Sequence, residues 1–458
     1  MSLLQNTMAK SGTVNFYNGV ATTSLRLDDG SAAHLHRTPA ADSSDAARKK
    51  YTFSTWVKRA SLGTTQQILA IGSGAGGAPW FFLYFLTSDQ IQAYWYSTTS
   101  GNATNSSPTF APVLRDTSAW YNIVLVVDTT DGTATDRFKL YINGVRAAVA
   151  TAGNALLQNY IGVINSNIKH YIGSNANTEQ YLDAYLADTN MIDGTAIGET
   201  SGYLDEFGEL KNGVWIPKDT SDLTFGANGF RLKYTSTAHD APASEGDADT
   251  DNIGADSSGE NNHWTALDAI VASDCAMPDS PENNFATLNP LAANTSTQTL
   301  SEGNLKATFP NANAGGIASS TFGVSSGKWY WEILILGNDG NTQPKLGIVP
   351  VETFTNTSSS IDAATYGYTY GRDGNKSIVG SVSSYGATFT NNDIISFALD
   401  MDAGNLVAYK NGVSQGTLAT SISGTQTPAF TAYGGYVESA NFGSPPYAIS
   451  SGNTDGNG

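Results

Sequence analysis

Three alternating aspartates could supply hard oxygen ligands to a calcium ion: Asp247, Asp249 and Asp251. An EF-hand loop, however, needs a glycine where Asn252 stands and a bidentate glutamate where Ser258 stands. The sequence therefore leaves two interpretations open. One is a loop stiffened by calcium, and the other is an acidic loop exposed to solvent.

Tyrosines at alternate positions could stack on sugar rings. Tyr94 and Tyr96 share one face of an expected strand, with Trp95 on the opposite face. The same spacing recurs in a second set, Tyr366, Tyr368 and Tyr370. Alternating aromatic residues are also typical of cores and of cross-strand pairs, so contact with a glycan and ordinary packing both remain open.

The sequence gives little support for a histidine metal site or for a pair of catalytic carboxylates. His34 and His36 share a strand face, but two histidines without a third ligand nearby are typical of ordinary strand residues. A retaining glycan hydrolase that holds its nucleophile and acid on one face of a strand could carry them as Glu-x-Asp-x-x-Glu, and this spacing does not occur. The acidic cluster that comes closest to this spacing consists of Asp205, Glu206 and Glu209, and we expect it to lie in a solvated loop. We expect no catalytic residue, no enzyme activity and no cofactor other than the calcium considered above.

Two similar hairpins must position these residues. In residues 392–413, apolar residues alternate with polar or small ones, a turn follows Asp400, and the returning strand ends at Asn411-Gly412. The same pattern of alternation, turn and returning strand occurs in residues 120–145, and both segments end in Tyr-x-Asn-Gly-Val. This repetition predicts two related β-sandwich domains.

The composition excludes several classes of partner. A net charge of −18 and a pI near 4.5 argue against nucleic acid and anionic membranes. The longest apolar run, residues 79–86, is too short to cross a bilayer, and the N-terminus shows no secretory signal. A single cysteine, Cys275, excludes an internal disulfide framework.

The first 198 residues carry a family resemblance. FSTWVKR, WYN before VLVVD, LYINGV, and YIGS followed by YLDAYLADTNMIDG resemble a laminin-G-like domain of the concanavalin A-like lectin/glucanase superfamily. The resemblance implies a jelly roll of two antiparallel sheets over residues 1–198.

The rest of the chain resembles two further segments. FGELKNGVWIPKD, GANGFRLKY, DNIGADSSGENNHWTALD and DSPENNFATLNP, within residues 199–290, resemble the linker in structural proteins of tailed bacteriophages, notably marine ones. In those proteins the linker joins a laminin-G-like domain to a SPRY-like one. GKWYWE, LGIV, YKNGV and NFGSPPY resemble a SPRY domain over residues 291–448, which implies recognition through loops without catalysis. Residues 449–458 are expected to form a flexible tail.

The sequence thus predicts an all-β protein of two antiparallel jelly-roll-type sandwiches joined by an irregular Asp/Asn/Gly-rich connector. The resemblance implies a non-catalytic bacteriophage virion surface protein, a tail-fibre or spike component that recognises a host receptor, with a surface glycan as the ligand. The first alternative is a structural capsid or tail decoration protein without a ligand of its own, and a glycan depolymerase comes last. Expected partners are other virion proteins and further copies of the chain, for example in a trimer, with no nucleic acid and no membrane insertion. The protein would assemble in the host bacterial cytoplasm and function on the virion surface.

Overall fold

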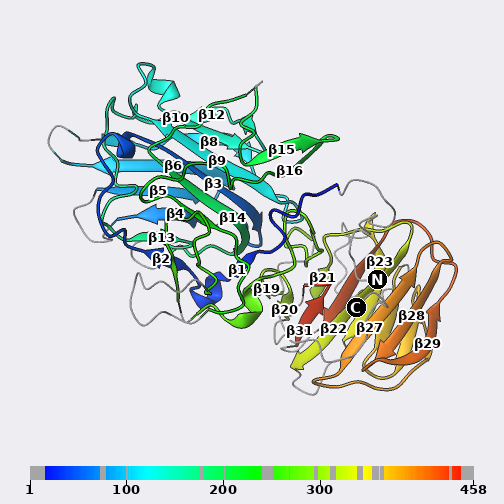
Figure 1. Cartoon of the computed structure of the whole chain (residues 1–458). Coiled ribbons are helices and arrows are strands. Elements are labelled where there is room, and N and C mark those ends of the chain that lie inside the picture. The colour runs from blue at the N-terminus through cyan, green and yellow to red at the C-terminus, as the bar shows by residue number, and fades with distance from the viewer. Residues whose placement is uncertain are drawn as a thin grey trace. The chain divides into compact units, whose positions relative to one another are not determined.

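The computed structural model of the chain describes residues 16–72, 79–99, 102, 104–175, 179–200, 202–239, 251–267, 269–292, 298–309, 316–337, 344–352, 361, 366–432 and 436–444. It is nearly all β, with 46% strand and 4% helix, which confirms the predicted fold class. The helical turns are short 3-10 segments, η1 (Asp29–Ser31), η2 (Ala47–Lys49), η3 (Ala134–Asp136) and η4 (Ala272–Asp274). No helix in these ranges is long and apolar enough to cross a membrane. The chain divides into two compact units, residues 9–283 and residues 284–458 (Figure 1).

Two antiparallel sheets form the first unit. The seven-stranded sheet has the order β1 (Leu25–Leu27), β14 (Ala184–Asp193), β3 (Lys50–Arg59), β9 (Tyr121–Asp128), β10 (Phe138–Ile142) and β11 (Val145–Arg146), and β17 (Phe230–Leu232) also pairs with β14. The nine-stranded sheet has the order β12 (Val149–Thr151), β8 (Thr109–Val113), β6 (Gln90–Ser97), β5 (Trp80–Phe85), β4 (Gln66–Ile71), β13 (His170–Ile172), β2 (Leu35–Arg37) and β18 (Thr265–Ala266), and β7 (Thr104–Ser106) pairs with β6. Aliphatic and aromatic side chains from both sheets form one core between them.

The segment that the sequence predicts as a connector has an irregular backbone, but most of it packs onto the first unit. Strand β17 extends the seven-stranded sheet, β18 extends the nine-stranded sheet, and β15 (Gly208–Lys211) pairs with β16 (Val214–Pro217) in a separate hairpin. Phe230, Trp264 and Cys275 are buried in the core of the first unit. The division between the units falls after residue 283, before the expected boundary at residue 290.

The second unit is also a pair of antiparallel sheets. One has the order β19 (Thr299–Ser301), β20 (Lys306–Thr308), β31 (Val437–Asn441), β22 (Lys328–Gly337), β27 (Ile394–Asp400), β28 (Asn405–Lys410) and β29 (Val413–Ala419). The other has the order β21 (Gly316–Ser319), β30 (Gln426–Ala432), β23 (Lys345–Pro350), β24 (Tyr368–Gly371), β25 (Asn375–Ile378) and β26 (Ser381–Ser384). Trp331 stacks on Phe397 in the core, with ring centroids 5.2 Å apart.

The two similar hairpins have the same turn. Asn143 and Gly144 have φ values of 49° and 74°, and Asn411 and Gly412 have 48° and 78°. Positive φ at both central residues is the geometry of a type I′ turn, which the Asn-Gly pairs predict. Each asparagine also accepts a hydrogen bond through its side-chain oxygen, from the backbone of Asn122 and of Ile394, both at 2.8 Å. A third turn of this kind, Asn212-Gly213, closes the β15–β16 hairpin.

These turns allow a matched test of packing at Gly144. A Cβ on Gly144 would lie 2.2 Å from Cη2 of Trp215, whereas a Cβ on Gly213 would meet nothing within 4 Å. Both glycines have positive φ, so alanine at either position costs about 1–2 kcal/mol in backbone strain. We expect Gly144→Ala to lower the free energy of unfolding of the first unit by clearly more than Gly213→Ala, as measured by chemical denaturation. Equal losses would show that Trp215 does not pack on this turn.

A carboxyl group lies inside the second unit. Glu438 on β31 has no exposed surface, and neither of its carboxylate oxygens has a hydrogen-bond partner in the part of the chain that the structure describes. Burial raises the pKa of Glu438 well above its ordinary value of 4.5. The folded state therefore holds a proton that the unfolded state releases near pH 4.5.

This difference predicts how the stability of the second unit depends on pH. A group with a raised folded-state pKa contributes stability at low pH, and that contribution is lost as the pH rises above the unfolded-state value towards the folded-state value. We expect Glu438→Gln to remove part of this decline and to raise the melting temperature of the second unit at neutral pH, because glutamine stays uncharged. Melting curves between pH 4 and pH 8 test the prediction, and a variant with the wild-type pH dependence would contradict it.

Candidate functional site

The outer face of the seven-stranded sheet is covered in part by the stretch that follows residue 202. We call its described residues, 203–239, 251–267 and 269–283, the covering segment. Val124, Val126, Tyr141 and Ile192 of the sheet form one buried apolar cluster with Leu204, Phe207 and Phe225 of the covering segment. A second cluster joins Trp56, Trp120, Tyr185 and Ala187 to Met277, with Trp215 packed against it. This face is therefore closed to a large ligand.

Two buried ion pairs join the sheet to loops of the covering segment, and a third joins β14 to β17, the strand that this segment adds to the sheet. Lys58 Nζ lies 2.7 Å from Asp279 Oδ2, with side chains 0% and 1% exposed. Arg26 on β1 donates to Asp274, with Nε at 3.0 Å from Oδ1. Asp279 also accepts a hydrogen bond from Trp120 Nε1 at 3.1 Å. Burial lowers the pKa of Lys58, and the charge of Asp279 opposes this change.

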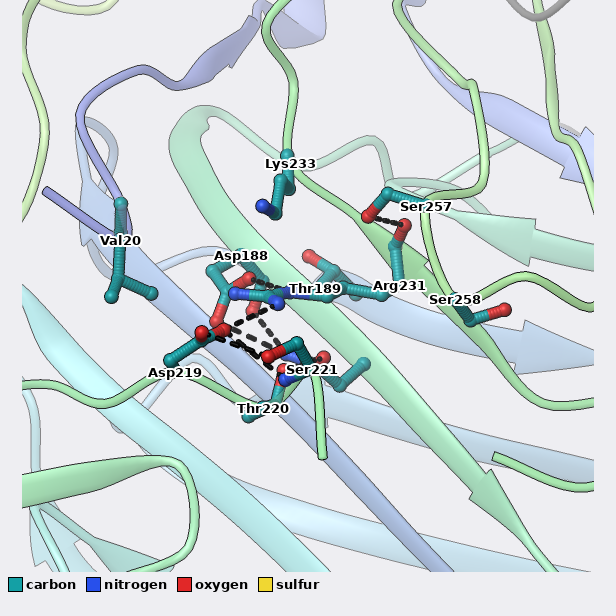
Figure 2. Close-up of polar contacts among 12 residues, drawn as sticks. Val20, Asp188, Thr189, Asp219, Thr220, Ser221, Arg231, Lys233, Ser257 and Ser258 are labelled. Atoms are coloured by element: carbon teal, nitrogen blue, oxygen red, sulfur yellow. Dashed lines mark hydrogen bonds and ion pairs between the residues drawn. The ribbon is translucent and has the colours of Figure 1, made fainter. Parts of the chain in front are cut away.

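The third pair belongs to a network around Arg231 of β17 (Figure 2). Its Nε donates to Asp188 of β14 and its Nη1 to Asp219 of the covering segment, both at 2.9 Å. A register shift between Ala187 and Asn190 accompanies the positive φ of Asp188, 42°.

The two carboxylates of this network differ in pKa. Burial raises the pKa of Asp188 despite the charge of Arg231. Partial burial alone would raise the pKa of Asp219 too, but hydrogen bonds from Arg231 and Ser221 outweigh it and lower the pKa to about 2. Such divergence can mark an acid and base pair. Here, however, both carboxylates bind one guanidinium and Asp188 is 2% exposed, so the network holds the covering segment in place.

A serine of the second unit also lacks catalytic surroundings. Residues 323–327 read Gly-Val-Ser-Ser-Gly, which matches the pattern of a nucleophile elbow in sequence only. Ser325 precedes strand β22, whereas an elbow precedes a helix. All five histidines of the chain lie in the first unit, so Ser325 has no histidine base in its own unit.

The outer face of the nine-stranded sheet carries aromatic side chains. Burial alternates along β5 and β6, which places Trp95 in the core and Tyr94 and Tyr96 on the outer face. Trp80 stacks on Tyr96, with centroids 4.4 Å apart and planes 19° from parallel. Phe82 lies 6.1 Å from Trp80 and 6.4 Å from Tyr94. We call Trp80, Phe82, Tyr94 and Tyr96 the aromatic platform.

Polar side chains flank the aromatic platform. Tyr84 on β5 donates to Gln92 on β6, and Gln92 Nε2 donates to Thr109 Oγ1 at 2.8 Å. None of the nine strands of this sheet contains an aspartate or a glutamate, although the chain has 41 acidic residues. The strands thus offer stacking surfaces and amide groups without a repelling carboxylate, a combination suited to a glycan.

A second group on the same sheet, missed as a unit by sequence analysis, is the histidine cluster: His34, His36, Tyr171 and Tyr181. His34 lies 6.0 Å from the ring of Tyr171 and 5.9 Å from that of Tyr181. Strands β2 and β13 have three residues each, too few for period-2 alternation to reveal Tyr171 as their neighbour.

The second predicted tyrosine set lies elsewhere. Tyr370 is fully buried in the core of the second unit, and Tyr366 is 8% exposed in a smaller buried cluster. Tyr368 is half-buried and packs against the same core as Tyr370. Buried rings cannot present a face to a sugar, so the alternation here reflects packing.

The predicted calcium ligands fall mostly outside the described residues, which exclude Asp247 and Asp249. Asp251 is exposed, and its backbone carbonyl accepts a hydrogen bond from Ser236. Elsewhere in the described ranges, no group of three or more histidine, cysteine or acidic side chains is placed to hold a metal ion. Calcium binding stays a prediction.

Comparison with protein families agrees with the two sandwiches. Residues 29–197 match a family model described as the concanavalin A-like lectin/glucanases superfamily, and residues 328–445 match the SPRY domain. The chain therefore contains a lectin-like domain of the laminin-G type and a SPRY domain, both generally binding modules.

Individual relatives match parts of the chain. It is 30% identical over 162 residues to a Drosophila melanogaster protein described as a Ran-binding proteins 9/10 homolog, over 32% of this chain and 16% of that protein. The chain thus matches less than a fifth of this relative's length. The crystal structure of the SPRY domain of human HERC1 is 22% identical, over 33% of this chain and 96% of that one, with a TM-score of 0.29. The TRIM65 PSpry domain is 15% identical, over 34% of this chain and 92% of that one, with a TM-score of 0.28.

Substitutions in the buried pair of Lys58 and Asp279 measure how much the contact with the covering segment stabilises the first unit. Asp279→Asn takes the carboxylate away from the buried Lys58 ammonium, and breaking a buried pair in this way costs about 3–5 kcal/mol. We expect this loss in the free energy of unfolding of the first unit, and partial recovery in the double variant Lys58→Met/Asp279→Asn.

A surface pair provides the control. Arg146 and Asp136 are also 2.7 Å apart, but their side chains are 44% and 34% exposed. Asp136→Asn should therefore cost less than about 1 kcal/mol. Similar losses for Asp279→Asn and Asp136→Asn would contradict the buried pairing.

Proposed function

We propose that this protein is a non-catalytic surface protein of a bacteriophage virion, a tail-fibre or spike component that recognises a glycan of the host surface. The observation that carries the proposal is the aromatic platform on a sheet without acidic residues. Stacked rings of Trp80 and Tyr96 offer apolar faces to the C–H face of a sugar, and neighbouring amides can bind its hydroxyl groups.

The virion context rests on the sequence resemblance. The motifs within residues 199–290 resemble the linker of tailed-phage structural proteins, and that linker joins the same two domain types in the same order. A net charge of −18 suits a protein displayed in solution. Further copies of the chain, for example in a trimer, would multiply a weak glycan site by avidity.

A second candidate is a structural decoration or fibre protein of the capsid or tail. It is favoured by the β15–β16 hairpin, which exposes Leu210 by 55% and Val214 by 46%. Exposed apolar residues on a hairpin suit contact with another virion protein. In this case the protein would bind particles and no glycan.

Binding without cleavage tests the proposal. We expect the purified chain, displayed on multivalent beads, to retain bacterial surface polysaccharide and to release no reducing sugar. Tyr94→Ala should weaken retention by about twofold to tenfold, since one aromatic contact contributes about 0.5–1.5 kcal/mol. Tyr203→Ala, which changes a tyrosine that is 38% exposed outside the nine-stranded sheet, should leave retention unchanged.

The outcomes separate the candidates. Retention on capsids or tails together with no retention of polysaccharide would favour the decoration protein. Release of oligosaccharides that one carboxylate substitution abolishes would instead show a depolymerase and overturn both non-catalytic functions.

A further inference from the structure

We infer that the histidine cluster is a second subsite of the same glycan site, so that the ligand is a linear polysaccharide lying across the strands from β6 to β2. This inference rests on the proposed function and adds to it the shape and the direction of the ligand. Three observations support it: the strand register, the ring contacts of the cluster, and the spacing between the two groups of rings.

Strand register places both groups on one line. Tyr94 lies opposite Phe82, Phe82 opposite Ala70, Ala70 opposite Tyr171, and Tyr171 opposite His36. Residues directly opposite each other in antiparallel strands point to the same face of the sheet. Five neighbouring strands thus carry one row of aligned residues, and four spacings of about 4.8 Å give it a length of roughly 19 Å. The labels β6, β5, β4, β13 and β2 follow one another in this order in Figure 1.

The histidine cluster offers a ligand the partly exposed rings of His36, Tyr171 and Tyr181, whereas His34 is 2% exposed and presents no face to it. His34 Nδ1 lies 3.0 Å from the carbonyl oxygen of Ala32, which fixes the ring, and burial lowers the pKa of His34 below its ordinary value of 6.5. The neutral ring lies beside Tyr171 and Tyr181, and His36 lies 6.5 Å from Tyr171. The cluster therefore adds a second group of neighbouring rings to this sheet, with planes tilted by 33° to 46° to one another.

The distance between the two groups of rings determines how long the ligand must be. Between the two groups stands Ala70, which has no exposed surface, so Tyr171 and Phe82 are two strand spacings apart, roughly 10 Å, with no contact surface between them. A single sugar ring cannot contact both groups, but a chain of several rings can. An extended peptide would gain less here, because the inner strands of a sheet already use their backbone groups in the ladders.

Because the nine strands contain no acidic residues, both neutral and anionic polysaccharides can bind this face. The one lysine or arginine of these strands, Arg37 of β2, is 7% exposed and bound to Asn228, and chains with carboxylate or sulfate groups meet no repelling carboxylate on the strands. The shared chemistry is thus a linear chain of sugar rings with exposed C–H faces.

The experiment compares ligand length with the site of substitution. Size-fractionated fragments of dextran, alginate, hyaluronan and agarose are titrated against the full chain, Tyr94→Ala and Tyr171→Ala. We expect disaccharides to lose affinity only in Tyr94→Ala. Fragments long enough to cover both groups should lose about twofold to tenfold in either variant, since both subsites then contribute to one binding event. Tyr171→Phe, which keeps the ring, should retain wild-type affinity, and melting curves show whether each variant is folded.

Each outcome decides a separate point. If no fragment of any length binds the wild-type chain, the proposed function fails, and this inference fails with it. If Tyr94→Ala weakens binding but Tyr171→Ala has no effect at any length, the aromatic platform stands and the second subsite is overturned. If Tyr171→Phe loses as much affinity as a folded Tyr171→Ala, the ring is not the contact, and the stacking subsite is likewise overturned.

Discussion

Three buried ion pairs hold the first unit together in the form described. Two of them join the sheet to loops of the covering segment, Arg26 with Asp274 and Lys58 with Asp279. The third, Asp188 with Arg231, joins β14 to β17, the strand that the covering segment adds to the sheet. A buried charge is tolerated only when it is paired and hydrogen-bonded. Without the covering segment, the sheet would expose two cations, one carboxylate and the apolar side chains around them. The segment is therefore part of the domain and determines which surface remains open.

The two sheets of the first unit consequently have different roles. The outer face of the seven-stranded sheet packs against the covering segment through apolar clusters and ion pairs. The nine-stranded sheet keeps half-buried aromatic side chains on its outer face, at positions where β5 and β6 alternate with the core. Aromatic residues at such positions contribute little to the core, so a contact outside the chain accounts better for their presence.

Much of the fold could be predicted from the sequence, because local patterns determine it. Alternation predicted that Trp95 lies on the face of its strand opposite Tyr94 and Tyr96, and the Asn-Gly pairs predicted turns with positive φ at Asn143 and Asn411. These features depend on the period of a strand and on the sterics of a few residues.

The rest depends on contacts between distant residues. Lys58 and Asp279 are 221 positions apart, and a lysine in an alternating strand normally indicates a solvent face. Tyr94 and Tyr370 have the same sequence spacing, yet only Tyr370 is buried, since its side chain faces the second sheet of its own unit. No local pattern states which face of a strand will be covered.

The most direct measurement is a crystal structure of the full chain with a bound fragment of a polysaccharide that it retains. The account predicts sugar rings stacked on Trp80, Tyr94 and Tyr96, with the covering segment in place on the other sheet. Density for the fragment on the β15–β16 hairpin or on the second unit alone, with the aromatic platform empty, would contradict it.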